Sequence, residues 1–265
     1  EFGSALALQG DRLLVGALAH ASGNGAVYAF DRSGTSWVES QRIDAPISYS
    51  HFGRSVALEG NRAVVGGPDT APGAVYLFQR TGSTWILDRT FLGFSCTGSF
   101  AFPRFGTSVA IADPWLFVGS ANFPDPFTDQ CGPRCVGYKR SGSTWNEILR
   151  VESADIFDQL GTSMDLDVPR LAVCAPYRPD HGSGSGAVDV LEFDGRTWNR
   201  TKELIPTEGG PRVQLGTSVS VEGSLVLVGG APYLPGTFEP LAVLYDESLA
   251  NVVCGGARSD ASCPW

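Results

Sequence analysis

Acidic side chains are the residues of this chain that could perform acid–base chemistry, and their positions argue against it. A glycoside hydrolase needs two carboxyl groups roughly 5–10 Å apart at one site. The acids of the short apolar segments lie in the middle or at the far end of those segments: Glu59, Asp165, Asp167 and Glu222. The four residues that start with each Phe-Gly or Leu-Gly pair, where such side chains would converge, include no acid. We therefore expect no enzymatic activity.

Histidine and serine offer no better-placed base or nucleophile. His20, His51 and His181 fall in three separate predicted loops, and His51 is interpreted as an ordinary loop residue. Residues 182–186, Gly-Ser-Gly-Ser-Gly, match the letters of a G-x-S-x-G nucleophile elbow. That elbow requires a strand followed by a helix, whereas this stretch is typical of a flexible linker.

Six cysteines and a single methionine favour an oxidising compartment and disulfide bonds over metal binding. Cys131 and Cys135 are separated by Gly-Pro-Arg, and no histidine lies close in sequence to complete a zinc site with them. We predict one bridge, between Cys254 and Cys263, which would close a short Gly-rich segment. The remaining pairing stays open, and it concerns Cys96, Cys131, Cys135 and Cys174.

Charge and hydropathy exclude several classes of partner. The net charge is −9 at neutral pH and the pI is near 4.8, whereas nucleic acids and anionic membranes bind basic patches. No apolar run approaches the roughly 20 residues that span a bilayer. We therefore expect no nucleic-acid partner and no membrane insertion, and we predict a secreted, extracellular or cell-surface protein.

The elements that position these residues repeat along the chain. Each repeat opens with an aromatic residue or leucine followed by glycine: Phe2-Gly3, Phe52-Gly53, Phe105-Gly106, Leu160-Gly161 and Leu215-Gly216. After Phe52, the segments RSVAL, RAVVGG, GAVYLF and WILDRTF are short, apolar and separated by turn residues, which indicates four strands. Four strands in a repeat of this length are typical of a propeller blade. We predict an all-β fold, a single β-propeller domain over residues 1–265 with five four-stranded blades: 2–51, 52–104, 105–159, 160–214 and 215–265.

The motifs FG-x-S-V-A-L, V-V-G-G-P and G-A-V-Y-L-F within residues 52–78 resemble the FG-GAP repeat of integrin alpha-subunit propellers. With their Gly-Ser-x-Trp turns, at residues 82–85 and 142–145, they are still more similar to the repeats of secreted microbial proteins. The resemblance covers essentially the whole chain. It implies the propeller fold but not one function, because the family includes adhesion proteins and lectins.

The resemblance also bears on calcium. The calcium loop of integrin propellers, D-x-D/N-x-D-G-x-x-D, lies between the first and second strands of a blade. Here that connection is cut to two residues in every repeat, so we expect no family-type calcium site and no cofactor. Asp125 and Asp129, in the insertion at residues 120–134, are the remaining candidates for an irregular calcium site.

Recurring aromatic residues are predicted to pack between blades rather than to bind ligands. The Phe-Gly pairs open the repeats, and a tryptophan begins the fourth strand of four of them: Trp37, Trp85, Trp145 and Trp198. A position kept in successive blades beside a turn is typical of structural packing.

Loop lengths place the functional surface on one face. The connections from first to second strand and from third to fourth strand are short, and both lie at the same face of a blade. The longer connections leave the opposite face, where binding residues of rigid scaffolds usually lie. We predict ligand contacts there: Phe123, Phe127, Tyr177, Arg178, Asp180, His181 and Tyr233. Alanine substitution of Phe127, Tyr177 and Arg178 is expected to weaken binding and to leave the melting temperature nearly unchanged.

We therefore predict a non-catalytic extracellular scaffold that presents loops of one propeller face to a protein or glycan ligand, as in adhesion. A first alternative is a lectin with one or a few sugar sites, in which Tyr177 or Tyr233 stacks on the sugar. A second alternative is a propeller enzyme of the glycoside hydrolase type.

Overall fold

The computed structural model describes residues 1–94, 103–121, 132, 134–153, 155, 157–179, 182–206, 212–231, 241–246 and 249–253. The chain divides into two compact units, Glu1–Val151 and Glu152–Trp265. Among the described residues, no helix is long and apolar enough to cross a membrane. The one short helix there is α1 (His20–Gly23), and the regular structure around it is β-strand.

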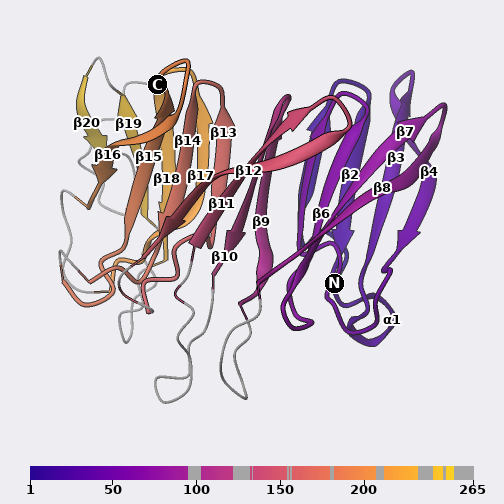
Figure 1. Ribbon diagram of the computed structural model, residues 1–265, viewed down its shortest axis with the longest axis horizontal. Coiled ribbons are helices and arrows are strands. Elements are labelled where there is room, and N and C mark those ends of the chain that lie inside the picture. Colours follow the sequence, from indigo (N-terminus) through magenta and orange to yellow (C-terminus); the bar gives the residue numbers. More distant parts are fainter. Residues whose placement is uncertain are drawn as a thin grey trace. The chain divides into compact units, whose positions relative to one another are not determined.

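The first unit contains three four-stranded antiparallel sheets (Figure 1). The first sheet is formed by β1 (Leu6–Gln9), β2 (Arg12–Ala17), β3 (Ala26–Ser33) and β4 (Ser36–Asp44). The second is formed by β5 (Ser55–Glu59), β6 (Arg62–Gly67), β7 (Ala74–Thr81) and β8 (Thr84–Leu92). The third is formed by β9 (Phe105–Ala112), β10 (Trp115–Ser120), β11 (Arg134–Ser141) and β12 (Thr144–Glu152).

The second unit contains two sheets of the same design. The fourth sheet is formed by β13 (Met164–Asp167), β14 (Arg170–Ala175), β15 (Ala187–Phe193) and β16 (Trp198–Leu204). The fifth is formed by β17 (Leu215–Glu222), β18 (Leu225–Gly230), β19 (Leu241–Asp246) and β20 (Leu249–Val253). The predicted all-β class with five four-stranded propeller blades is confirmed, and the single domain over residues 1–265 stays a prediction.

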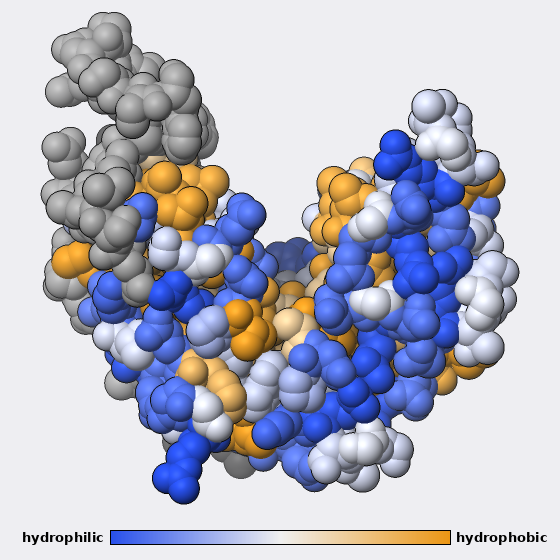
Figure 2. Space-filling model, turned by 90° about the horizontal axis from the view of Figure 1, so that it is seen from above, coloured by the Kyte–Doolittle hydropathy of each residue, from blue (hydrophilic) through white to orange (hydrophobic). Residues whose placement is uncertain are grey.

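Two-residue turns join the first two strands of every sheet, as the sequence predicts. The glycine of three such turns has a positive φ that L side chains rarely adopt: Gly10, Gly60 and Gly223. The β3–β4 and β7–β8 hairpins also turn on this side, at the top of the first unit in Figure 1. Figure 2 looks down on that side, and hydrophilic residues predominate among those drawn in colour.

The Phe-Gly pairs pack neighbouring sheets together. Phe52 is fully buried, and its ring meets that of Tyr76 edge to face at 5.4 Å. A Cβ on Gly16 would lie 2.0 Å from the carbonyl oxygen of Gly53, so the two backbones approach too closely for any other residue at position 16. The predicted packing role is confirmed for the four later pairs, whereas Phe2 is exposed.

Candidate functional site

The connection from β14 to β15 and the segment preceding β13 are joined at the loop side of the fourth sheet, the end from which its longer connections leave. The Tyr177 N–H donates to the carbonyl oxygen of Asp158 at 3.1 Å. The rings beside this bond face solvent, since Tyr177 is 39 % exposed and Phe157 is 51 % exposed. The two segments therefore present two aromatic side chains from backbones that are held together.

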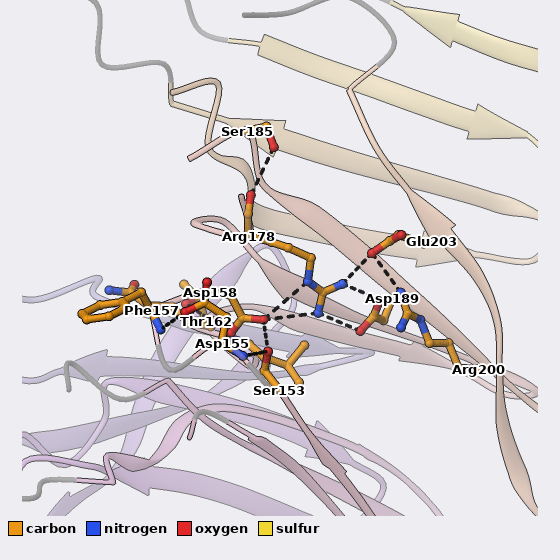
Figure 3. A network of polar contacts seen from close by, with 12 residues as sticks. Ser153, Asp155, Phe157, Asp158, Thr162, Arg178, Ser185, Asp189, Arg200 and Glu203 are labelled. Atoms are coloured by element: carbon orange, nitrogen blue, oxygen red, sulfur yellow. Dashed lines mark hydrogen bonds and ion pairs between the residues drawn. The ribbon is translucent and has the colours of Figure 1, made fainter. Parts of the chain in front are cut away.

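Arg178, the residue after Tyr177, is buried in an ion network (Figure 3). Its Nη1 donates at 2.8 Å to Asp189 Oδ1 and at 2.8 Å to Glu203 Oε1, and its Nη2 donates at 3.1 Å to Asp189 Oδ2. Both Nε and Nη2 lie 3.4 Å from Asp158 Oδ2. One guanidinium is thus shared by three carboxylates from three segments of the second unit.

A second arginine closes the network from the solvent side. Arg200 Nη2 lies 2.8 Å from Asp189 Oδ1 and 2.9 Å from Glu203 Oε1. Its side chain is 48 % exposed, whereas those of Asp189 and Arg178 are 2 % and 9 % exposed. Asp189 and Glu203 therefore each face two guanidinium groups.

Burial and charge act in opposite directions on these pKa values. Burial raises the pKa of Asp158 above its ordinary range, although hydrogen bonds from Ser153 and from the Leu160 N–H, and the nearby Arg178, partly oppose this. Burial lowers the pKa of Arg178, but its hydrogen bond to Asp189 and the attraction of Asp189 and Asp158 outweigh that effect, so the pKa is raised. Arg178 therefore remains charged at any physiological pH.

This arrangement anchors the connection from β14 to β15. The Arg178 carbonyl accepts hydrogen bonds from the Ser185 hydroxyl and the Gly186 N–H, both at 3.1 Å. Arg178 therefore ties the connection that carries Tyr177 to the sheet below it.

The structure differs here from the sequence-based expectation. Arg178 was expected as an exposed ligand contact, but its side chain is buried under the surface because three carboxylates compete for it. Tyr177 does lie at the surface. The other predicted contacts and metal candidates lie outside the described residues: Phe123, Phe127, Asp180, His181, Tyr233, Asp125 and Asp129.

Sequence reasoning missed Asp158, although the repeats carry a signal for it. Ser50 and Asp158 both stand two residues before the Phe-Gly or Leu-Gly pair, and both are fully buried. The carbonyl oxygen of each accepts a backbone N–H from the connection after the second strand, Asp69 or Tyr177. A carboxylate in place of a buried serine indicates a nearby cation.

A second polar cluster, in the first unit, was also missed. His51 Nδ1 lies 2.8 Å from Asp69 Oδ2, and Arg104 Nε lies 3.4 Å from Asp69 Oδ1. His51 and Arg104 are equivalent residues, each preceding a Phe-Gly pair with a positive φ of 49° or 50°. Asp69 thus bridges the starts of the second and third sheets, and the interpretation of His51 as an ordinary loop residue was incomplete.

Cysteine and acidic side chains are the other potential metal ligands of the chain. Cys174 is a buried free thiol on β14, and burial raises its pKa. The predicted Cys254–Cys263 bridge lies outside the described residues. Within the described part of the chain, no three His, Cys, Asp or Glu side chains are grouped to hold a metal ion. Asp165 and Asp167 instead accept the Val221 and Gly223 N–H groups of the fifth sheet, both at 2.7 Å.

Comparisons with known proteins agree with the fold. The family model of the FG-GAP repeat matches residues 37–78, which confirms the predicted resemblance to FG-GAP propeller repeats. No curated protein matches the chain. Among solved structures, the chain is similar to a protein from Bacteroides uniformis ATCC 8492 that is provisionally named 6-phosphogluconolactonase, with a TM-score of 0.63 and 10 % identity over 96 % of this chain and 70 % of that one. At this identity the similarity supports the fold alone.

Proposed function

We propose that this protein is a non-catalytic extracellular binding domain that holds a protein or glycan ligand on the loop side of its fourth sheet. The observation that carries the proposal is the exposed pair Phe157 and Tyr177, whose backbones are joined and anchored from below by Arg178. Exposed aromatic side chains are frequent anchors of binding surfaces. A loop that is already held in place loses less entropy when it binds.

The absence of catalysis is part of the proposal, and the ion pairs of the network support it. Asp189 and Glu203 are each engaged in ion pairs with both Arg178 and Arg200, so both carboxyl groups already have partners within the protein. Turnover of aryl glycosides or lactones that disappears in an Asp189→Asn variant would contradict this part of the proposal.

A binding screen against immobilised glycans and extracellular proteins tests the proposal, with the intact chain as probe in the presence and absence of a chelator. Ligands found in the screen are then compared between the wild type and a Phe157→Ala, Tyr177→Ala variant. We expect binding at least about tenfold weaker in the variant. The melting temperature should stay nearly unchanged, because both side chains are substantially exposed.

Tyr49→Ala is the matched control, because Tyr49 is an exposed tyrosine on a connection of the first unit. It should leave binding unchanged. If substitutions in the two-residue turns abolish binding and the aromatic variant does not, the ligand binds elsewhere and the proposal is wrong.

A further inference from the structure

A cleft of about 300 Å³ lies between the fourth and fifth sheets, inside the second unit. The fourth sheet contributes Arg170, Val190 and Lys202 to its lining, and the fifth sheet contributes Val226 and Tyr245. Val190 and Val226 are buried, whereas Lys202 is exposed. The cleft therefore combines buried apolar side chains with charged ones, which include Glu203 and Asp246 as well as the two cations.

Hydrogen bonds identify the equivalent place between the first and second sheets. Arg12 and Arg170 each begin the second strand of their sheet. Each donates from Nη1 to the carbonyl oxygen of the glycine in the next sheet's first turn, Gly60 or Gly223. The two pairs of sheets are therefore joined in the same way, and positions can be matched by strand register.

The register assigns counterparts to the cleft lining. Val190 pairs with Lys202 just before a bulge, as Ala29 pairs with Gln41 just before a bulge in the first sheet. The same comparison matches residues of the fifth sheet with residues of the second sheet. Val226 pairs with Tyr245, and Ala63 pairs with Phe78.

Between the first and second sheets this space is occupied by the indole ring of Trp85. Trp85 is buried in one cluster with the counterparts Ala29, Ala63 and Phe78. The side-chain amide of Gln41, the counterpart of Lys202, holds the backbone of Trp85. It accepts a hydrogen bond from the backbone N–H at 2.7 Å and donates one to the backbone carbonyl oxygen at 3.1 Å. The guanidinium carbon of Arg80 lies 5.9 Å from the ring centroid.

Between the second and third sheets a second tryptophan occupies the corresponding space. Trp145 packs against the cluster formed by these two sheets, and its ring centroid lies 6.2 Å from that of Phe91. Tyr138, the counterpart of Phe78, lies 5.0 Å from the same Phe91 ring. An indole ring at the start of the fourth strand is thus the regular filling between adjacent sheets of the first unit.

The fifth sheet cannot supply that ring. Asp246 pairs with Leu249 at the turn between β19 and β20, so this hairpin ends before the strand position at which Trp85 pairs with Arg80 in the second sheet. The sequence has no tryptophan between Trp198 and Trp265. The cluster between the fourth and fifth sheets contains Val226 and Tyr245 but no indole. The cleft is the space that a tryptophan fills elsewhere in the chain.

We propose that this cleft is a binding site for the planar aromatic ring of a small external ligand, of indole size. The apolar walls provide the contacts that Trp85 receives between the first and second sheets. Arg170 and Lys202 line the cleft as cations, which are attracted to the face of an aromatic ring. The site is separate from Phe157 and Tyr177, so this proposal does not depend on the proposed function.

Indole and N-acetyltryptophanamide are the probes that test this site, and the amide NMR spectrum of the intact chain is the readout. We expect saturable shifts at Val190, Val226 and Tyr245. Cyclohexylmethanol serves as a non-planar control of similar size and should bind at least about tenfold more weakly. Shifts that map elsewhere, or equal binding of cyclohexylmethanol, would overturn the proposal.

A variant that fills the cleft provides the second test. Lys202→Trp places an indole at an exposed position of β16 that lines the cleft. We expect it to weaken binding of the probes at least about tenfold. Glu39→Trp is the control, because it adds an indole at an exposed position of the first sheet. If Lys202→Trp folds and binds as the wild type does, the cleft is not the site.

The cleft could also receive an indole from the chain itself. Trp265 lies outside the described residues. A Trp265→Ala variant separates the two sources of an aromatic ring. Equal binding of N-acetyltryptophanamide by the wild type and this variant supports an external ligand. Binding by the variant alone would show that the chain fills its own cleft, and this would overturn the proposal.

Discussion

Replacing Arg178 by alanine removes the cation that three carboxylates share. The side chains of Asp158 and Asp189 are 0 % and 2 % exposed, so water cannot replace the lost partner without opening the structure. Removing one partner of a buried ion pair costs about 3–5 kcal/mol. At about 2–4 °C per kcal/mol for a chain of this size, we expect the melting temperature to fall by roughly 6–20 °C.

Arg200→Ala is the matched control, because Arg200 contacts two of the same carboxylates from an exposed position. Exposed ion pairs contribute about 0–1 kcal/mol, so this variant should lose at most a few degrees. Adding Asp158→Asn to Arg178→Ala removes one unpaired buried charge and should recover part of the lost stability.

Thermal and urea unfolding, followed by circular dichroism and tryptophan fluorescence, measure these differences in free energy. Two results would refute the reasoning. One is an Arg178→Ala variant within about 1 kcal/mol of the wild type. The other is an equal loss in the Arg178→Ala and Arg200→Ala variants, since burial would then have no role.

Three further predictions concern packing, acid stability and metal ions. Trp85→Ala should lower the free energy of unfolding in urea by about 3–5 kcal/mol, because the ring is buried. Trp37→Ala should lower it by less than about 1 kcal/mol, because Trp37 is exposed. Similar losses in the two variants would contradict the packing argument. A hydrogen bond from Arg140 holds the pKa of Asp113 below its ordinary value, so this pair's stability is present above the ordinary pKa and is lost as the pH falls through the lowered one. Urea unfolding from pH 5 to pH 2 should therefore show a larger loss in the wild type than in Asp113→Asn. The difference should be at most about 1 kcal/mol, because Asp113 is partly exposed. An equal or larger loss in Asp113→Asn would contradict this. A chelator should leave the melting temperature unchanged, since the two-residue turns are too short to wrap calcium; a drop of several degrees in a thermal melt would reveal a metal site.

The sequence by itself determined the strands, their turns and the repeat. Alternating apolar segments are read locally, and the turn glycines Gly10, Gly60 and Gly223 are required by a backbone conformation that involves few neighbouring residues. The packing of Phe52, Phe105 and Trp85 could be predicted for a related reason, because a repeated position in a repeated unit meets the same surroundings each time. Because the unit repeats, the packing of these side chains could be predicted from their position within one repeat.

At positions where the repeats differ, only the tertiary structure decides the surroundings and the burial of a side chain. Arg178 meets Asp158, Asp189 and Glu203 across separations of 20, 11 and 25 residues, and nothing local pairs a loop arginine with acids on other strands. The side chain was predicted to be exposed, and it is buried because the charges of β15 and β16 draw it inward. Likewise, the sequence shows that the fifth repeat lacks its tryptophan, but it does not show whether neighbours close the gap. Whether a missing ring leaves a cleft depends on how two sheets pack, and side-chain volumes summed across both sheets decide that.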